Sequence, residues 1–208
     1  MAEATKQALG PAPKLIPIYC TAEIPPTLID TLIIRTYMYA PPKLYLVDDA
    51  RRPTDAFDTC TFAKPPTAPF TSPFLNHTLA QLKEHFLSLP DDSRFFSAYT
   101  FIVLDERSIR DETCLLVSTI PEYESNEDLS IARSDFYVAA QTLIPVEMRT
   151  HRLTEGLKPT PGEPDGKVLF TEESIVEEMG EDWKIKDSVP RIGLNGQPRE
   201  WPARVEDL

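Results

Sequence analysis

The fold class is decided by two segments of the sequence, Leu44-Tyr45-Leu46-Val47-Asp48-Asp49 and Thr100-Phe101-Ile102-Val103-Leu104-Asp105-Glu106. Each is a short, continuous apolar run, typical of a β-strand that is buried on both faces of a sheet. Each run ends in two acidic residues. If the two strands are parallel, four carboxylates gather at one edge of the sheet, where open α/β sheets bind ligands. In the alternative interpretation, the acids only mark where the strands leave the core for solvent.

Further apolar runs and helix signals extend this pattern along the chain. We predict additional strands at Thr31–Tyr37 and Thr113–Thr119, and helices at Ser72–Leu89 and from Ser134 onward. The alternation predicts an α/β fold, with a small, mostly parallel or mixed sheet of four to five strands and flanking helices. The gap between the Thr31–Tyr37 strand and Leu44 is too short for a parallel crossover. These two strands are therefore expected to be antiparallel neighbours or not adjacent.

Local signals support both predicted helices. Ser72 suits the N-cap position of the first helix, and Pro73 suits its first turn. In the second helix, Pro145 is expected to break or restart the helix, because proline lacks the N–H group that an interior helical residue donates.

The chain divides by composition into three parts. Residues 1–27 are rich in proline and are predicted to form an extended leader across the surface. Residues 28–153 form the predicted α/β core domain, and residues 154–208 form an extended, proline-rich C-terminal arm. The only two tryptophans, Trp183 and Trp201, lie in the arm, so we expect the arm to pack on the core or on a second protomer. Asn195-Gly196 is a turn signal typical of β-hairpins.

Charge and cysteine content exclude several function classes. The net charge of −12 comes from 33 acidic and 21 basic residues, a balance that repels nucleic acid and anionic membranes. No apolar stretch approaches the roughly 20 residues that span a bilayer. The three cysteines are widely spaced and odd in number, which argues against a disulfide framework. We therefore expect a cytoplasmic protein whose partner is a small molecule or a protein, with a homodimer as one candidate assembly.

Arg35 is a candidate ligand-binding residue because it interrupts an apolar segment. An arginine at such a position is costly unless it is paired. It is either a clamp for an anionic ligand or the partner of a structural salt bridge. The candidate salt-bridge partners are Asp48, Asp49 and Asp135.

No motif in the sequence supplies a complete catalytic or metal-binding set. There is no glycine-rich phosphate loop, no zinc-protease motif and no nucleophile elbow. His77 and His85 lie eight residues apart in one predicted helix, which places them about 80° from a common face. We therefore predict no metal and no cofactor.

The segment Asn126–Phe136 (Asn-Glu-Asp-Leu-Ser-Ile-Ala-Arg-Ser-Asp-Phe) resembles a signature, roughly NNLSIANMDF, of an uncharacterised family of bacterial and fungal domains. Leu32–Thr36 and Val47–Asp49 are similar to earlier parts of that family, and the resemblance covers about residues 30–150. The chain departs from the family between these two segments, where a proline loop replaces a helix. The resemblance implies no reaction. It implies a set of positions of interest: Arg35, Asp48, Asp49, Asn126 and Asp135.

Two hypotheses about function follow. In the first, the chain is a non-catalytic binding or regulatory protein that recognises a protein or a small ligand, with Arg35, Asn126 and Asp135 as binding residues. In the second, it is a small accessory enzyme, an isomerase, cyclase or hydrolase of the kind found in fungal secondary metabolism. That enzyme would use Asp48, Asp49 or Asp105 as acid/base groups and Arg35 to orient an anionic group. Only the second hypothesis requires Arg35, Asp49 and Asp105 to converge in one pocket.

Overall fold

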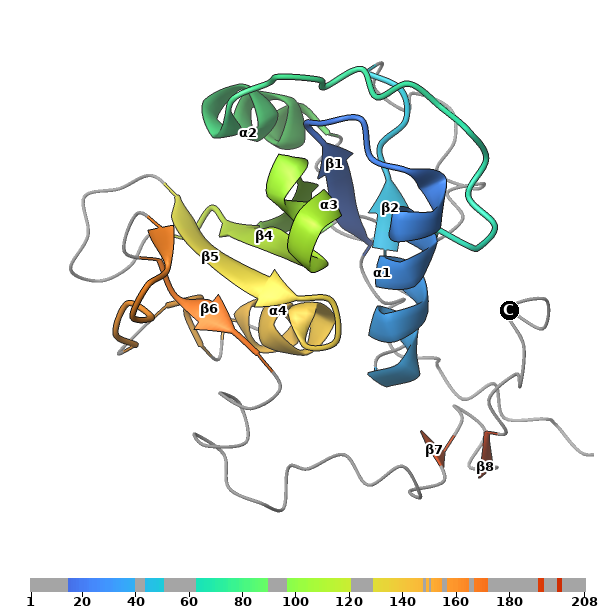
Figure 1. Ribbon diagram of the computed structural model, residues 1–208. Coiled ribbons are helices and arrows are strands. Elements are labelled where there is room, and N and C mark those ends of the chain that lie inside the picture. The colour runs from blue at the N-terminus through green and yellow to red at the C-terminus, as the bar shows by residue number, and fades with distance from the viewer. Residues whose placement is uncertain are drawn as a thin grey trace, which may run out of the picture.

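The protein has a mixed α/β fold, a mixed sheet with flanking helices, as predicted (Figure 1). The sheet has six strands instead of the predicted four to five, because β1 and β6 lie outside the predicted core domain. The computed structural model describes residues 15–39, 44–50, 63–89, 97–120, 129–147, 149, 151–154, 157–164, 167–171, 191–192 and 198–199. Within these residues, no helix is long and apolar enough to cross a membrane.

Six strands form the main sheet, in the order β2-β1-β3-β4-β5-β6. Their bounds are β1 Ile16–Cys20, β2 Leu44–Leu46, β3 Thr100–Leu104, β4 Thr113–Ser118, β5 Ser130–Asp135 and β6 Leu169–Phe170. Strand β4 is antiparallel to both of its neighbours, and all other neighbouring pairs are parallel. The strands β2, β1, β3, β5 and β6 therefore all end at the same edge of the sheet.

Helices cover both faces of this sheet. Their bounds are α1 Pro26–Tyr39, α2 Leu79–Ser88, α3 Glu106–Asp111 and α4 Ala139–Glu147. One apolar core joins α1 and α4 to one face of the sheet, and a second core joins α2 to the other face. Figure 1 accordingly shows α2 apart from α1 and α4. The short helix α3 lies between the end of β3 and the start of β4.

The predicted strand at Thr31–Tyr37 is wrong, because these residues belong to α1. Ile29, Leu32 and Ile33 recur at helical spacing and are fully buried against the sheet. Burial of this face outweighs the modest preference of β-branched residues for strands. Since α1 is itself the crossover, β2 pairs in parallel with β1, and the predicted antiparallel arrangement does not occur.

The prediction that residues 1–27 form a surface leader is also wrong for its last part. Residues Ile16–Cys20 form β1, which lies between β2 and β3 inside the sheet. The side chains of Ile18 and Tyr19 are fully buried, one toward each core. Pro17 has no backbone N–H to donate to a neighbouring strand. It is tolerated because the pairing of β1 with β3 begins only at Ile18, so no hydrogen bond to β3 is lost.

The helix predicted from Ser134 begins later, at Ala139, and residues Ser130–Asp135 form strand β5 instead. This strand escaped prediction because polar residues occupy much of it, including the buried Ser130 and Ser134. Pro145 does not break the following helix, which continues for two further residues. The cost is a single intrahelical hydrogen bond, the one that an N–H at position 145 would donate to the carbonyl of Gln141.

The N-cap of α2 lies six residues after the predicted N-cap, Ser72. The true cap is Thr78, which forms a capping box with Gln81: the Thr78 hydroxyl accepts from the Gln81 N–H, and the Gln81 side chain accepts from the Thr78 N–H. Asn76 has a φ angle of 61°, which ends the preceding turn before the helix starts. Ser72 instead donates to the carbonyl of Cys20 at 2.6 Å and so links this segment to β1.

The predicted C-terminal arm contributes to the sheet. Leu169 and Phe170 form β6 at the sheet edge beside β5 (Figure 1). Farther along, β7 (Arg191–Ile192) pairs antiparallel with β8 (Pro198–Arg199), on either side of Asn195-Gly196 in the sequence. Trp183 and Trp201 lie outside the described residues.

We expect Thr78→Ala to lower the free energy of unfolding by about 1 kcal/mol, because the N-cap hydroxyl satisfies an otherwise unpaired helix N–H. Thr78→Ser, which keeps this hydroxyl, should remain close to the wild type. Urea unfolding followed by circular dichroism measures both variants. Equal losses for alanine and serine would show that the hydroxyl does not cap the helix.

Candidate functional site

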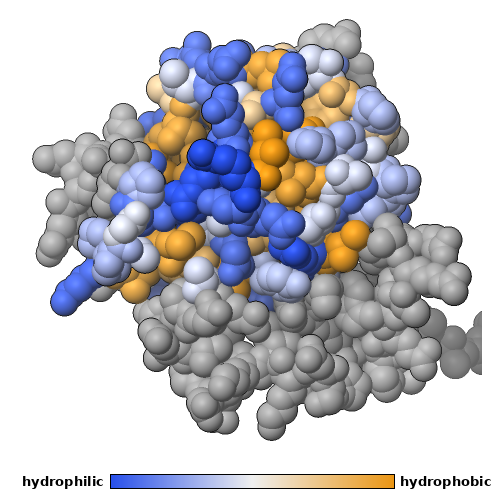
Figure 2. Space-filling model, viewed as in Figure 1, coloured by the Kyte–Doolittle hydropathy of each residue, from blue (hydrophilic) through white to orange (hydrophobic). Residues whose placement is uncertain are grey.

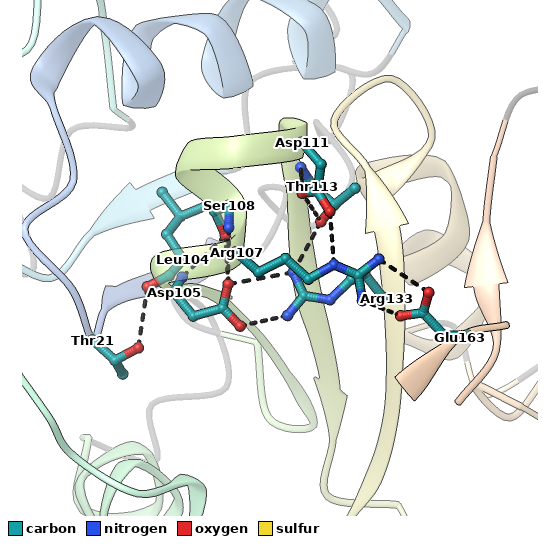
Figure 3. Close-up of polar contacts among 9 residues, drawn as sticks. All are labelled: Thr21, Leu104, Asp105, Arg107, Ser108, Asp111, Thr113, Arg133 and Glu163. Atoms are coloured by element: carbon teal, nitrogen blue, oxygen red, sulfur yellow. Dashed lines mark hydrogen bonds and ion pairs between the residues drawn. The ribbon is translucent and has the colours of Figure 1, made fainter. Parts of the chain in front are cut away.

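Asp105 does not stand free at the end of β3, because it forms a buried ion pair with Arg133 of β5 (Figure 3). The side chain of Arg133 is 5% exposed and that of Asp105 is 25% exposed. Arg133 also donates to the hydroxyl of Thr113 at 2.9 Å. On the other side, Asp105 caps α3 by accepting from the N–H and the hydroxyl of Ser108, each at 3.0 Å. Every part of this carboxylate is therefore used to hold β3, α3, β4 and β5 together.

The electrostatics of Asp105 oppose a role as a general acid. Burial raises its pKa, but the hydrogen bonds and charge of Arg133 and the hydrogen bonds from Ser108 outweigh burial, so the pKa lies below its usual value. A general acid at neutral pH needs the opposite shift. Figure 2 shows hydrophilic residues gathered over the middle of this face, where α3 lies.

A second set of ion pairs fastens the following segment to α3. Arg107 donates to both carboxylate oxygens of Glu163 and, at 2.7 Å, to Asp111 (Figure 3). The Glu163 side chain is only 4% exposed. This contact fixes residues 157–164 beside the sheet ahead of β6. It therefore explains how the arm reaches the sheet edge.

Arg35 is paired, but not with any of the predicted partners. It forms an ion pair with Glu112, at the junction of α3 and β4, and its guanidinium lies 4.7 Å from the ring centroid of Tyr137. Glu112 occupies the left-handed C-cap position of α3, with a φ angle of 54°. The contact ties α1 to this junction. The structural interpretation of Arg35 is thus favoured over an anion clamp.

The remaining predicted residues take separate positions. Asp48 and Asp49 are exposed after β2. Asp135 ends β5 and accepts the N–H groups of Tyr137 at 2.9 Å and Val138 at 3.1 Å, which is a turn-forming role. Asn126 lies outside the described residues.

Asp49 and Asp105 do share one edge of the sheet, since β2 and β3 both run parallel to β1. However, β1 separates them, and two strand spacings amount to about 10 Å. Arg35 pairs with Glu112 instead of joining either acid. The sequence left open whether these two acids share an edge, and the directions of β2 and β3 show that they do. The convergence required by the enzyme hypothesis is not found among the described residues.

A cavity of about 240 Å³ opens at this same edge, at the carboxyl end of β1. One wall is the β1–α1 loop, with Cys20, Ala22, Glu23, Ile24 and Pro25. The other wall is the segment that leads into α2, with Phe70, Thr71, Ser72 and Leu75. The sequence did not point to this cavity, because its first wall falls within the predicted surface leader of residues 1–27.

The two walls are held together by hydrogen bonds at their base. The Ser72 hydroxyl donates to the carbonyl of Cys20 at 2.6 Å, and the N–H of Asn76 donates to the carbonyl of Thr21 at 2.9 Å. Phe74 anchors the second wall by packing edge-on against Tyr19 of β1, with ring centroids 5.0 Å apart. The cavity is therefore formed before any ligand arrives, which lowers the entropic cost of binding.

The chain order places this cavity at a topological switch point. Strand β1 has β2 on one side and β3 on the other, so the order of the strands reverses at β1. Helix α1 leaves toward one face of the sheet, and α2 returns over the other face. Loops that diverge in this way leave a crevice outside the carboxyl ends of the strands, which is where open α/β sheets bind ligands.

Among the described residues, the titratable groups near the cavity form neither an activated nucleophile nor a metal site. Burial raises the pKa of the Cys20 thiol to about 12, so the thiol stays protonated at neutral pH. His85 shares a hydrogen bond of 3.0 Å with the hydroxyl of Tyr19 and serves to join α2 to β1. Among the described residues, no group of three or more histidine, cysteine or acidic side chains could hold a metal ion.

Comparison with known proteins identifies no relative of this chain: no family model, no curated protein and no solved structure matches it.

We expect Asp105→Asn to lower the free energy of unfolding at pH 7 by about 3 kcal/mol. Asparagine still caps α3, but the substitution leaves Arg133 buried without its charge partner. This value is at the lower end for a broken buried pair, because Asp105 is partly exposed. Urea unfolding of the wild type and of Asp105→Asn measures this loss. Glu106→Gln is the control, because it removes one negative charge from an exposed neighbouring residue.

The difference between wild type and Asp105→Asn should depend on pH. Because the pKa of Asp105 is lower in the folded chain than in the unfolded chain, its contribution is complete above the unfolded value of about 3.9 and is lost as the pH falls through the folded value. The two unfolding curves should therefore converge on acidification below about pH 4. A constant difference down to the lowest pH at which the protein stays folded would contradict this assignment.

Proposed function

We propose that this protein binds a small ligand in the cavity at the carboxyl end of β1, and that it acts as a binding or regulatory protein. The observation that carries the proposal is the coincidence of a preformed cavity with the topological switch point. The cavity is smaller than those that hold drug-sized molecules, so the ligand is a correspondingly small molecule.

The contacts of the candidate acids favour this proposal over the enzyme hypothesis. Asp105 is committed to Arg133, and Arg35 is committed to Glu112. Asp48 and Asp49 are exposed at the end of an edge strand. An acid/base mechanism needs a carboxyl group within hydrogen-bond reach of a bound substrate. Among the described residues, the cavity contains one such group, Glu23, and no base that would complete a pair with it.

The cavity itself can be filled to test the proposal. Thr71→Trp and Ala22→Phe each introduce a large side chain into one wall, while Ala80→Trp adds the same bulk at an exposed position of α2. We expect a panel of small amines, alcohols, amides and carboxylates to shift the backbone amide resonances of residues 20–25 and 70–75 in the wild type and in Ala80→Trp. Both filled variants should lose these shifts.

Nuclear magnetic resonance suits this experiment, because a ligand of this size binds weakly and the method detects weak binding at known residues. Circular dichroism establishes that each variant is folded. The proposal fails if no member of the panel shifts these amides in the wild type, or if both filled variants bind as the wild type does.

A further inference from the structure

We infer that the ligand of this cavity is a small organic cation, an alkyl- or arylammonium compound, an inference that rests on the proposed function. The charge of the lining, the shortage of N–H donors in its loop and the apolar side chains beside Glu23 all favour such a ligand.

The first observation is that the loop cannot bind an anion in the way that switch-point loops usually do. Phosphate and carboxylate ligands are held there by backbone N–H groups of a glycine-rich loop and a helix N-terminus. Here the loop contains no glycine, and Pro25 and Pro26 remove two N–H donors at the start of α1. Of the remaining donors, Ile24 N–H bonds to Ala22 and Leu28 N–H bonds to Pro25.

The second observation is that, of the described residues that line the cavity, Glu23 is the only charged one. It is exposed at the cavity, and no hydrogen bond or ion pair joins its carboxylate to any other described residue. The hydroxyl of Thr71, in the opposite wall, likewise has no partner within the described part of the chain. Since a carboxylate only accepts hydrogen bonds, Glu23 is matched by a ligand that donates them and carries positive charge.

The third observation is that an apolar surface adjoins this carboxylate. Phe70, Ile24, Pro25 and Leu75 line the same cavity. The face of Phe70 attracts a cation, and the aliphatic side chains suit a hydrocarbon body. The net charge of −12 adds a long-range attraction for cations. A bare metal ion fits less well, because it would find one carboxylate and a protonated thiol in place of several hard oxygen ligands.

Three probes of similar shape and different charge test the inference: benzylammonium, benzyl alcohol and benzoate, each titrated into the isotope-labelled protein at pH 7. We expect benzylammonium to bind the wild type about two- to fivefold more tightly than benzyl alcohol, because an exposed ion pair contributes about this factor. Benzoate should bind most weakly. Glu23→Gln should remove the preference for the cation, and Glu23→Lys should reverse it.

Two control variants separate this inference from the proposed function. Glu84→Gln removes one negative charge from an exposed position of α2 and should bind all three probes as the wild type does. Thr71→Trp should abolish binding of all three. If the wild type binds the three probes equally, or Glu23→Gln keeps the preference while Thr71→Trp abolishes binding, the cation assignment is overturned and the cavity remains the site. If no probe shifts the cavity amides, or Thr71→Trp binds as before, the proposed function itself is overturned.

Discussion

The burial of β1 between two parallel neighbours is the constraint on which the rest of the structure depends. Its side chains alternate between the two cores, with Ile16, Ile18 and Cys20 toward α1 and α4 and Tyr19 toward α2. Because β2 and β3 pair with opposite sides of the same strand, the two connecting helices must pass over opposite faces. The crevice at the carboxyl end of β1 is a geometric consequence of this arrangement. The shape of the cavity therefore depends on the packing of β1.

The ion pair between Asp105 and Arg133 connects strands in the other half of the sheet, which comprises β3, β4 and β5. Strand β4 is the single antiparallel member of the main sheet, and the chain must turn at α3 to enter it. Asp105 caps α3 and at the same time pairs with Arg133 two strands away. A buried ion pair contributes little net stability against an apolar replacement, yet its loss is costly. Here the pair links the end of β3 and the start of α3 to β5.

The acidic side chains near this edge of the sheet fall into two groups, those paired with arginines and those that are not. Acids that would be reactive if free are neutralised by arginines, Asp105 by Arg133 and Glu163 by Arg107. Glu23, by contrast, lines the cavity without a partner among the described residues. The edge therefore separates structural charge, which is paired and buried, from charge that is available to a ligand. A ligand recognised there has to complement one carboxylate and an apolar wall.

The sequence by itself determined the α/β class and the strands β2, β3 and β4, because continuous apolar runs report burial on both faces. It did not determine that Asp49 and Asp105 share an edge, since that depends on strand direction, which only the tertiary structure decided. It did not determine α1, whose β-branched residues are typical of strands, or β1 and β5, where Pro17 and buried serines interrupt the apolar pattern. Only the tertiary structure decided which charges pair, since the partners of Arg35 and Asp105 lie 77 and 28 residues away. Only the tertiary structure formed the cavity, because its walls are separate in the sequence and meet through the bonds of Ser72 and Asn76.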